Sequence, residues 1–178
     1  MKRRIFVALN LSDALKNEIL DWRKQIKMEK DLIRWLKPQN LHITLLPPWY
    51  VESIDETTEL LESNKNWVRP IKIHFDQIEF GPTLNYPRLI WAKGQSPSQI
   101  LELKNKLEKI LNQEPEKRDY LLHLTVARFR PENFKNFSIK KLGTEISWKD
   151  QIESFSLLES HLSPKGASYE VLLQIPLI

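Results

Sequence analysis

Residues 41–45 read Leu41-His42-Ile43-Thr44-Leu45, and residues 122–126 repeat the pattern as Leu122-His123-Leu124-Thr125-Val126. Polar and apolar residues alternate in both stretches, which is typical of a β-strand that is buried on one face. In an extended chain, side chains two positions apart point to the same side, so each histidine lies beside a threonine. We therefore expect two half-buried strands, each presenting a histidine and a threonine on its polar face.

The segments around these stretches follow a duplicated order of strand, helix and strand. An apolar run at residues 4–9 predicts a buried strand, and Ser12 or Asp13 is expected to cap the helix that follows it. A strand at residues 88–93 precedes a second helix, with Ser96 as its expected cap and Pro97 at its first position. The apolar stripe of the first helix consists of Leu15, Ile19, Trp22 and Ile26.

The rest of the chain adds more strands than helices. Strands are expected at residues 33–36, 71–80, 120–129, 151–159 and 168–175, and a short helix at residues 56–62. Because the order lacks a strict strand–helix–strand alternation, the pattern predicts an α+β fold with mainly antiparallel sheets. The last two strands can pair with either half of the chain.

Composition excludes several classes of protein and site. The chain has 178 residues, of which 41% are hydrophobic and 28% charged, so disorder is excluded as its overall state. It has no cysteine, which excludes disulfides, thiolate metal sites and a cysteine nucleophile. There is no glycine-rich phosphate loop and no stretch long and apolar enough for a membrane helix. A cytoplasmic protein with no membrane partner is expected, and the net charge of +4 is compatible with a phosphate-bearing ligand.

Two His-Thr pairs that face each other suit a phosphodiester. One imidazole can deprotonate a nucleophile, the other can protonate the leaving oxygen, and the hydroxyls can donate hydrogen bonds to the remaining oxygens. Histidine fits both tasks because its ordinary pKa lies near neutrality. The alternatives are two ordinary strand residues at each position, or a zinc site. No zinc-binding histidine spacing is present in the sequence, so no metal is expected.

With these motifs, the sequence resembles the two-histidine (2H) phosphoesterase superfamily, and within it the bacterial and archaeal RNA 2′,3′-cyclic phosphodiesterases that are also described as 2′-5′ RNA ligases. The matching segments are residues 4–9, 33–35, 40–45, 88–92, 120–128 and 169–172. The resemblance implies one bilobal domain over residues 1–178, with two pseudo-symmetric lobes, each an antiparallel sheet with outer helices, and an active cleft between them.

The resemblance also implies the roles of five residues. His42 would be the proton donor and His123 the proton acceptor, while Thr44, Thr125 and Arg128 would bind the substrate phosphate. The reaction would be hydrolysis of RNA or nucleotide 2′,3′-cyclic phosphate ends to a 2′-phosphate, without metal or cofactor, by a monomer. Ligation to a 2′-5′ linkage at the same site, and a noncatalytic module that binds RNA ends or nucleotides, are the alternatives.

Three positions depart from the pattern of the family. Pro47 replaces a phenylalanine that can stack on a base, and Leu122 replaces the usual proline before the second histidine. Strict alternation would place Arg128 on the face opposite to His123 and Thr125. Either the strand ends or bulges before Arg128, or Arg128 is an ordinary surface arginine, and we expect the bulge.

Further candidates surround the motifs. His74 and His161 are expected to be exposed or structural, and Trp35 and Trp91 to pack in the core. Trp49 and Tyr50 are candidates for the missing base stack at the mouth of the cleft. A basic rim for an RNA backbone is a further hypothesis, with Arg34, Lys37, Lys93 and Arg130 as its members.

Overall fold

The structure is a computed structural model that describes residues 2–64, 67–142, 145–164 and 166–178. Its helices are α1 (Asp13–Gln25), α2 (Ile54–Ser63) and α3 (Ser98–Ile110), with short 3₁₀ helices η1 (Pro38–Asn40) and η2 (Pro131–Asn136). Its strands are β1 (Arg3–Leu9), β2 (Ile33–Trp35), β3 (Ile43–Val51), β4 (Ile71–Gly81), β5 (Leu89–Gly94), β6 (Leu122–Phe129), β7 (Glu145–Ile152), β8 (Ser154–Ser163) and β9 (Gly166–Pro176).

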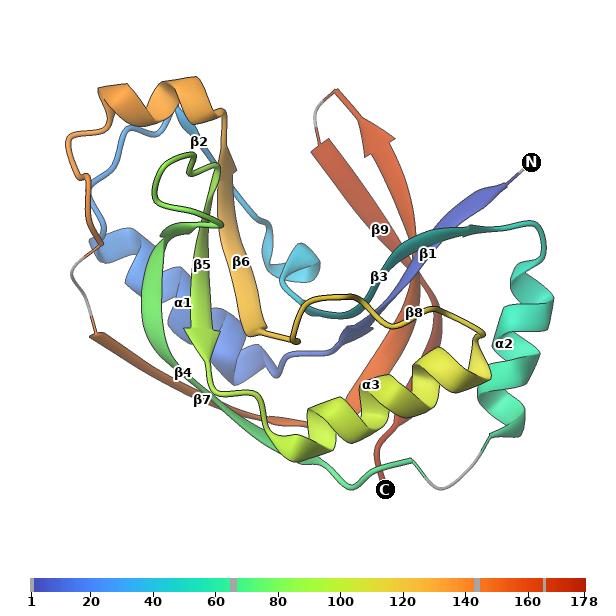
Figure 1. The fold of residues 1–178 in the computed structure, drawn as a ribbon. Coiled ribbons are helices and arrows are strands. Elements are labelled where there is room, and N and C mark those ends of the chain that lie inside the picture. Colours follow the sequence, from blue (N-terminus) through green and yellow to red (C-terminus); the bar gives the residue numbers. More distant parts are fainter. Residues whose placement is uncertain (1, 65–66, 143–144, 165) are drawn as a thin grey trace.

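The strands form two antiparallel sheets, which confirms the predicted α+β, two-lobed architecture. One sheet has the order β3-β1-β8-β9, and the other has the order β2-β6-β5-β4-β7. In Figure 1 the five-stranded sheet is on the left and the four-stranded sheet on the right. The strands β6-β5-β4-β7 repeat the arrangement of β3-β1-β8-β9, so β3, which His42 directly precedes, and β6, which carries His123, occupy equivalent places.

Each of the two long helices packs against the sheet of the other lobe. Helix α1 follows β1 in the chain but contacts β7, where the rings of Trp22 and Trp148 meet at 5.6 Å. Helix α3 follows β5 but contacts β3 of the four-stranded sheet. One apolar cluster therefore includes residues from both sheets, such as Val7 of β1 and Phe75 of β4.

Only one of the two expected helix caps is present. Ser12 caps α1 by accepting a hydrogen bond from the Leu15 amide at 3.1 Å. The prediction for Ser96 is wrong, because Pro97 is the N-cap of α3 and makes no side-chain hydrogen bond. The Ser96 hydroxyl instead accepts a hydrogen bond from the Leu122 amide at 2.9 Å. It thus fixes the start of β6, one residue before His123.

The predicted strand at 151–159 is divided between two sheets. Strand β7 ends at Ile152 in the five-stranded sheet, and β8 begins at Ser154 in the other. Strand β8 does not alternate between buried and exposed residues in its first part, because Ser154–Ser160 are all buried. The strand predicted at 168–175 is β9, which pairs with β8 beside β1.

Candidate active site

The rings of His42 and His123 are each held by an equivalent hydrogen bond to the backbone. Nδ1 of His42 lies 2.8 Å from the carbonyl oxygen of Asn40, and Nδ1 of His123 lies 2.8 Å from that of Leu121. A carbonyl can only accept, so Nδ1 of each ring carries a proton and donates it. Each neutral ring can therefore take up a proton at Nε2, and the imidazolium that forms can give that proton up again.

A bulge at the same position of each strand continues the correspondence. In β6, Ile90 pairs with Ala127 and Trp91 with Thr125, so Val126 is an extra residue. Val126 and Ala127 are both buried, and Arg128 then returns to the polar face that carries His123. This register shift confirms the predicted bulge.

Strand β3 has the matching irregularity after Thr44. Val7 pairs with Leu46 and Ala8 with Thr44, which leaves Leu45 as the extra residue. Pro47 therefore occupies in β3 the place that Arg128 occupies in β6, so only one lobe contributes a guanidinium at this position.

The two polar faces line adjoining cavities between the lobes. One cavity, of about 500 Å³, contains His123 and Thr125, and the other, of about 560 Å³, contains His42. Thr44 and Arg128 line both cavities. The structure thus brings all five predicted site residues to two interlobe cavities that share Thr44 and Arg128.

Aromatic rings enclose His42. The rings of Phe6 and Tyr169 pack against the imidazole, with their centroids 5.2 Å and 5.1 Å from its centroid. The pKa of His42 is lowered from 6.5 to about 4, mainly by burial; the hydrogen bond to Asn40 opposes this shift, and the neighbouring Arg128 and His123 add to it. His42 is consequently neutral at neutral pH in the free protein.

Trp91 lies beside His123 on the wall of the cleft, so the prediction that it belongs to the core is wrong. Its ring is 5.2 Å from the imidazole and lines the same cavity. Gly81 leaves the space that the Trp91 ring occupies, because a Cβ at residue 81 would lie 2.5 Å from the indole. Trp35 does pack against the apolar cluster, with its ring 6.1 Å from that of Trp22.

Tyr120 joins the segment before β6 to β3. Its hydroxyl donates a hydrogen bond to the carbonyl oxygen of Thr44 at 3.0 Å. Burial raises the pKa of this hydroxyl well above its ordinary value, so it stays protonated and remains a donor. The bond fixes the backbone of one His-Thr pair against the strand that carries the other.

Members of the proposed basic rim have different surroundings. Arg34 and Lys37 line a further cavity next to His42, together with Arg128. Lys93 forms an ion pair with Glu79 at 2.6 Å, and Arg130 is the N-cap residue of η2. The rim is therefore concentrated on the β2 side of the cleft.

Comparison with known proteins adds to this geometry. The family model of the 2′-5′ RNA ligase superfamily matches residues 11–163. The chain belongs to this superfamily.

Relatives in the superfamily match the chain almost end to end. The RNA 2′,3′-cyclic phosphodiesterase of Methanocaldococcus jannaschii is 31% identical and covers 95% of this chain and 98% of its own. That of Archaeoglobus fulgidus is 28% identical and covers 94% and 96%. The crystal structure of Escherichia coli LigT with 3′-AMP has the same fold, with a TM-score of 0.76, 21% identity and 99% of both chains covered.

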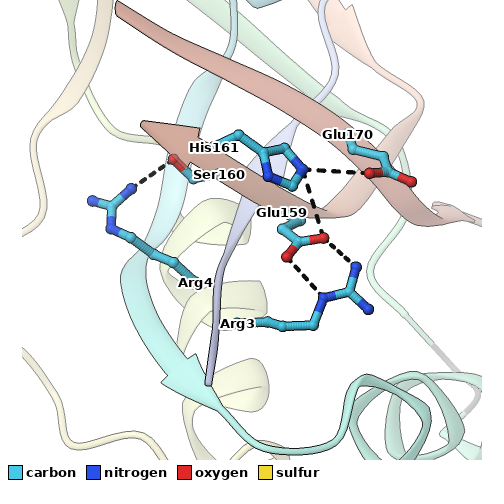
Figure 2. Close-up of polar contacts among 6 residues, drawn as sticks. All are labelled: Arg3, Arg4, Glu159, Ser160, His161 and Glu170. Carbon is cyan, nitrogen blue, oxygen red and sulfur yellow. Dashed lines mark hydrogen bonds and ion pairs between the residues drawn. The ribbon is translucent and has the colours of Figure 1, made fainter. Parts of the chain in front are cut away.

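Two further histidines lie outside the site that this superfamily member presents. His74 is exposed and contacts Ser147 Oγ at 3.0 Å. Figure 2 shows His161 between Glu159 and Glu170, with the guanidinium of Arg3 on Glu159. The ligand atoms of His161 and the two glutamates lie within 4.8 Å of one another, but the charge of Arg3 beside Glu159 disfavours a cation there.

The prediction that Trp49 or Tyr50 replaces the missing base stack is not supported. Trp49 is half-buried against the core, and Tyr50 is exposed on β3 opposite Arg4. Among the described residues that line the two cavities are Pro47 and Pro48 instead. Two register shifts between β1 and β3, one after Thr44 and one between Leu46 and Trp49, change the side of the strand on which the residues beyond them lie.

Sequence reasoning missed the residues that surround His42. Phe6 lies in an apolar run that predicts only burial, and Tyr169 is far away in the chain. Arg4 and Arg88 also line the cavities, and Figure 2 shows the hydrogen bond of 2.6 Å from Arg4 to Ser160 Oγ. The resemblance to the family included residues 169–172, which was the available signal for Tyr169. Within the described residues, no helix is long and apolar enough to cross a membrane.

Proposed function

We propose that the protein hydrolyses the 2′,3′-cyclic phosphate at RNA or nucleotide ends to a 2′-phosphate, without a metal ion. The observation that carries this proposal is the matched pair of imidazoles, each with Nδ1 on a carbonyl and with a threonine on the same face. The names of the relatives that match most of the chain support the same activity. A binding module has no need of two such groups.

The reaction requires groups on opposite sides of the phosphorus. Water attacks in line with the ring oxygen that leaves, so the base and the acid must face each other across the phosphate. Strands β3 and β6 come from different lobes, and their Cα atoms approach within 8 Å. We assign Thr44, Thr125 and Arg128 to the non-bridging oxygens, where hydroxyl and guanidinium donors stabilise the charge of the transition state.

The two imidazoles need different protonation states. We assign His123 as the base that activates water and His42 as the acid that protonates the 3′ oxygen. Since the pKa of His42 is about 4 in the free protein, His42 must take up a proton when the anionic phosphate enters. In the reverse assignment His42 is the base. It then needs no proton uptake of its own, because neutral His42 already has a free lone pair on Nε2.

A substrate whose leaving group needs no proton separates these assignments. It should restore turnover in His42→Ala and leave His123→Ala inactive if His42 is the acid. Rescue of His123→Ala alone would reverse the roles, and rescue of neither or both would remove the division.

The test of the activity itself is hydrolysis of an oligonucleotide with a 2′,3′-cyclic phosphate end in the presence of EDTA. We expect a 2′-phosphate product. If turnover needs Mg²⁺ or Zn²⁺, the two-histidine mechanism is wrong. A second oligonucleotide with a 5′-hydroxyl in the same reaction detects joining to a 2′-5′ linkage, which uses the same site with a sugar hydroxyl in place of water.

We further propose that residues 1–178 act as one bilobal unit and as a monomer in the cytoplasm. The apolar cluster that includes both sheets supports the single unit. A monomer is supported because one chain supplies both His-Thr pairs and Arg128.

A further inference from the structure

A third cavity, of about 390 Å³, adjoins the one that contains His42. It lies between the β2–η1 segment and the β8–β9 hairpin. The two cavities share six lining residues, which are Arg34, Arg128, Ser163, Gly166, Ala167 and Tyr169. A ligand bound at His42 can therefore extend into this third space.

The charge of the third cavity suits an anion. Its lining includes the three cations Arg34, Lys37 and Arg128, together with polar groups such as Asn40 and Ser168. Among the described residues that line it, none is acidic. Arginine pairs with two oxygens of a phosphate group, and lysine adds a compact positive charge.

Arg34 and Arg128 lie directly opposite each other on β2 and β6. Like charges at opposed positions of neighbouring strands destabilise a sheet, and an anion between them relieves the repulsion. Burial is the main cause that lowers the pKa of Arg128, and the nearby charges of Arg34 and Arg88 lower it too. A site that concentrates positive charge in this way is typical of phosphate binding.

Gly166 brings the hairpin close to Arg34. Its φ of +120° is a conformation that side-chain-bearing residues rarely adopt, and a Cβ there would lie 2.6 Å from Nη1 of Arg34. The backbone of one lobe thus lies against the guanidinium of the other, at the boundary of the two cavities.

The opposite end of the cleft has a different chemistry. The cavity around His123 has mixed charge, because the carboxylates of Glu116 and Asp119 lie among the cations Arg88, Arg118 and Arg128, and it includes the apolar surfaces of Pro47 and Trp91. Carboxylates repel a second phosphate, whereas apolar rings suit a nucleobase. Among the described lining residues, carboxylates occur in the cavity around His123 and not in the third cavity, so a second phosphate of an RNA backbone is better placed beside Arg34 and Lys37.

We propose that the third cavity binds the phosphodiester that precedes the cyclic phosphate in an RNA chain. The protein then selects the ends of RNA chains over mononucleoside 2′,3′-cyclic phosphates, which carry only the reacting phosphorus. This inference rests on the proposed function and names its substrate class.

The experiment compares kcat/KM for a nucleoside 2′,3′-cyclic phosphate and for a dinucleotide with the same terminal nucleoside, at one ionic strength. The wild-type protein should prefer the dinucleotide by about tenfold, as expected for a charge-assisted phosphate contact. Arg34→Ala and Lys37→Ala should each remove most of this preference. Lys72→Ala, which changes an exposed lysine on β4, is the matched control and should keep it.

The outcomes separate the subsite from the activity. If the wild-type protein hydrolyses both substrates but shows no preference, or if both variants keep it, the subsite is wrong and the proposed function stands. If the wild-type protein hydrolyses neither substrate, the proposed function is wrong, and the subsite that rests on it is wrong with it.

Discussion

His42 and His123 are related by position, hydrogen bond and strand geometry. Each ring donates through Nδ1 to the carbonyl two residues before it, at 2.8 Å. In each strand the bulge follows the threonine by one residue. The equivalence ends at their surroundings, since Phe6 and Tyr169 enclose His42 and Trp91 lies against His123. Two chemically matched groups thus acquire different environments, as an acid and a base require.

The first prediction concerns the pKa of His42. It should titrate at about pH 4 in the free protein, because burial disfavours the imidazolium. Tyr169→Ala lets water reach the ring and should raise the pKa toward 6.5, whereas Tyr86→Ala, an exposed tyrosine, should not. NMR titration checks this, and ordinary titration of His42 in the wild-type protein would contradict it.

The second prediction concerns the threonine hydroxyls. Thr44→Ala and Thr125→Ala should each weaken transition-state stabilisation by about 1–3 kcal/mol, because each removes one donor from a desolvated phosphate. Both variants should keep the fold, since each loses one small polar group from a half-buried face. Steady-state kinetics with circular dichroism as the control measure this. Full activity of both variants would mean that the hydroxyls do not contact the substrate.

The third prediction concerns Arg128. Arg128→Ala should raise KM by about tenfold or more, because a guanidinium can hold two phosphate oxygens at once. Arg128→Lys should not restore the wild-type KM, since lysine lacks the planar fork. Arg130→Ala is the matched control, because Arg130 lies at the start of η2 beyond the bulge. Equal effects of the two alanine variants would indicate a diffuse basic surface instead.

The fourth prediction concerns the ion pair that holds β1 against β8. Two hydrogen bonds from Arg3 lower the pKa of Glu159 (Figure 2). A depressed carboxyl pKa stabilises the fold above the pKa of the unfolded chain, and this contribution is lost as the pH falls through the folded value. Glu159→Gln should reduce the free energy of unfolding by about 1–2 kcal/mol at pH 7.

The pH dependence is the control for this variant. The difference between Glu159→Gln and the wild-type protein should disappear at a pH below the pKa of Glu159 in the fold. Chemical denaturation at both pH values measures it. A difference that persists in acid would mean that the charge of Glu159 is not its source.

Local patterns were sufficient to predict most strands and the composition of the site. The period of two placed His42 beside Thr44 and His123 beside Thr125, and the alternation problem at Arg128 predicted the bulge. These features depend on neighbours in the chain. The resemblance to the family added the two lobes and the cleft between them.

The remaining features depend on contacts between distant segments. Tyr169 reaches His42 because β9 joins the sheet of β1 through β8, a pairing that periodicity leaves open. The low pKa of His42 follows from that burial. Trp91 alternates with polar neighbours like a core residue, and its place beside His123 depends on Gly81 in the adjacent strand. Ser96 resembles a helix cap but bonds to Leu122 at the start of β6.

The most direct test of the central claim is the rate of cyclic-phosphate hydrolysis by His42→Ala, His123→Ala and the double variant. Each single change should lower kcat/KM by roughly 10²–10⁴-fold, because each removes one acid/base group. The double variant should lose less than the product of the two single losses, since the groups act on one transition state. If either single variant keeps the wild-type rate, the two histidines do not form a catalytic pair.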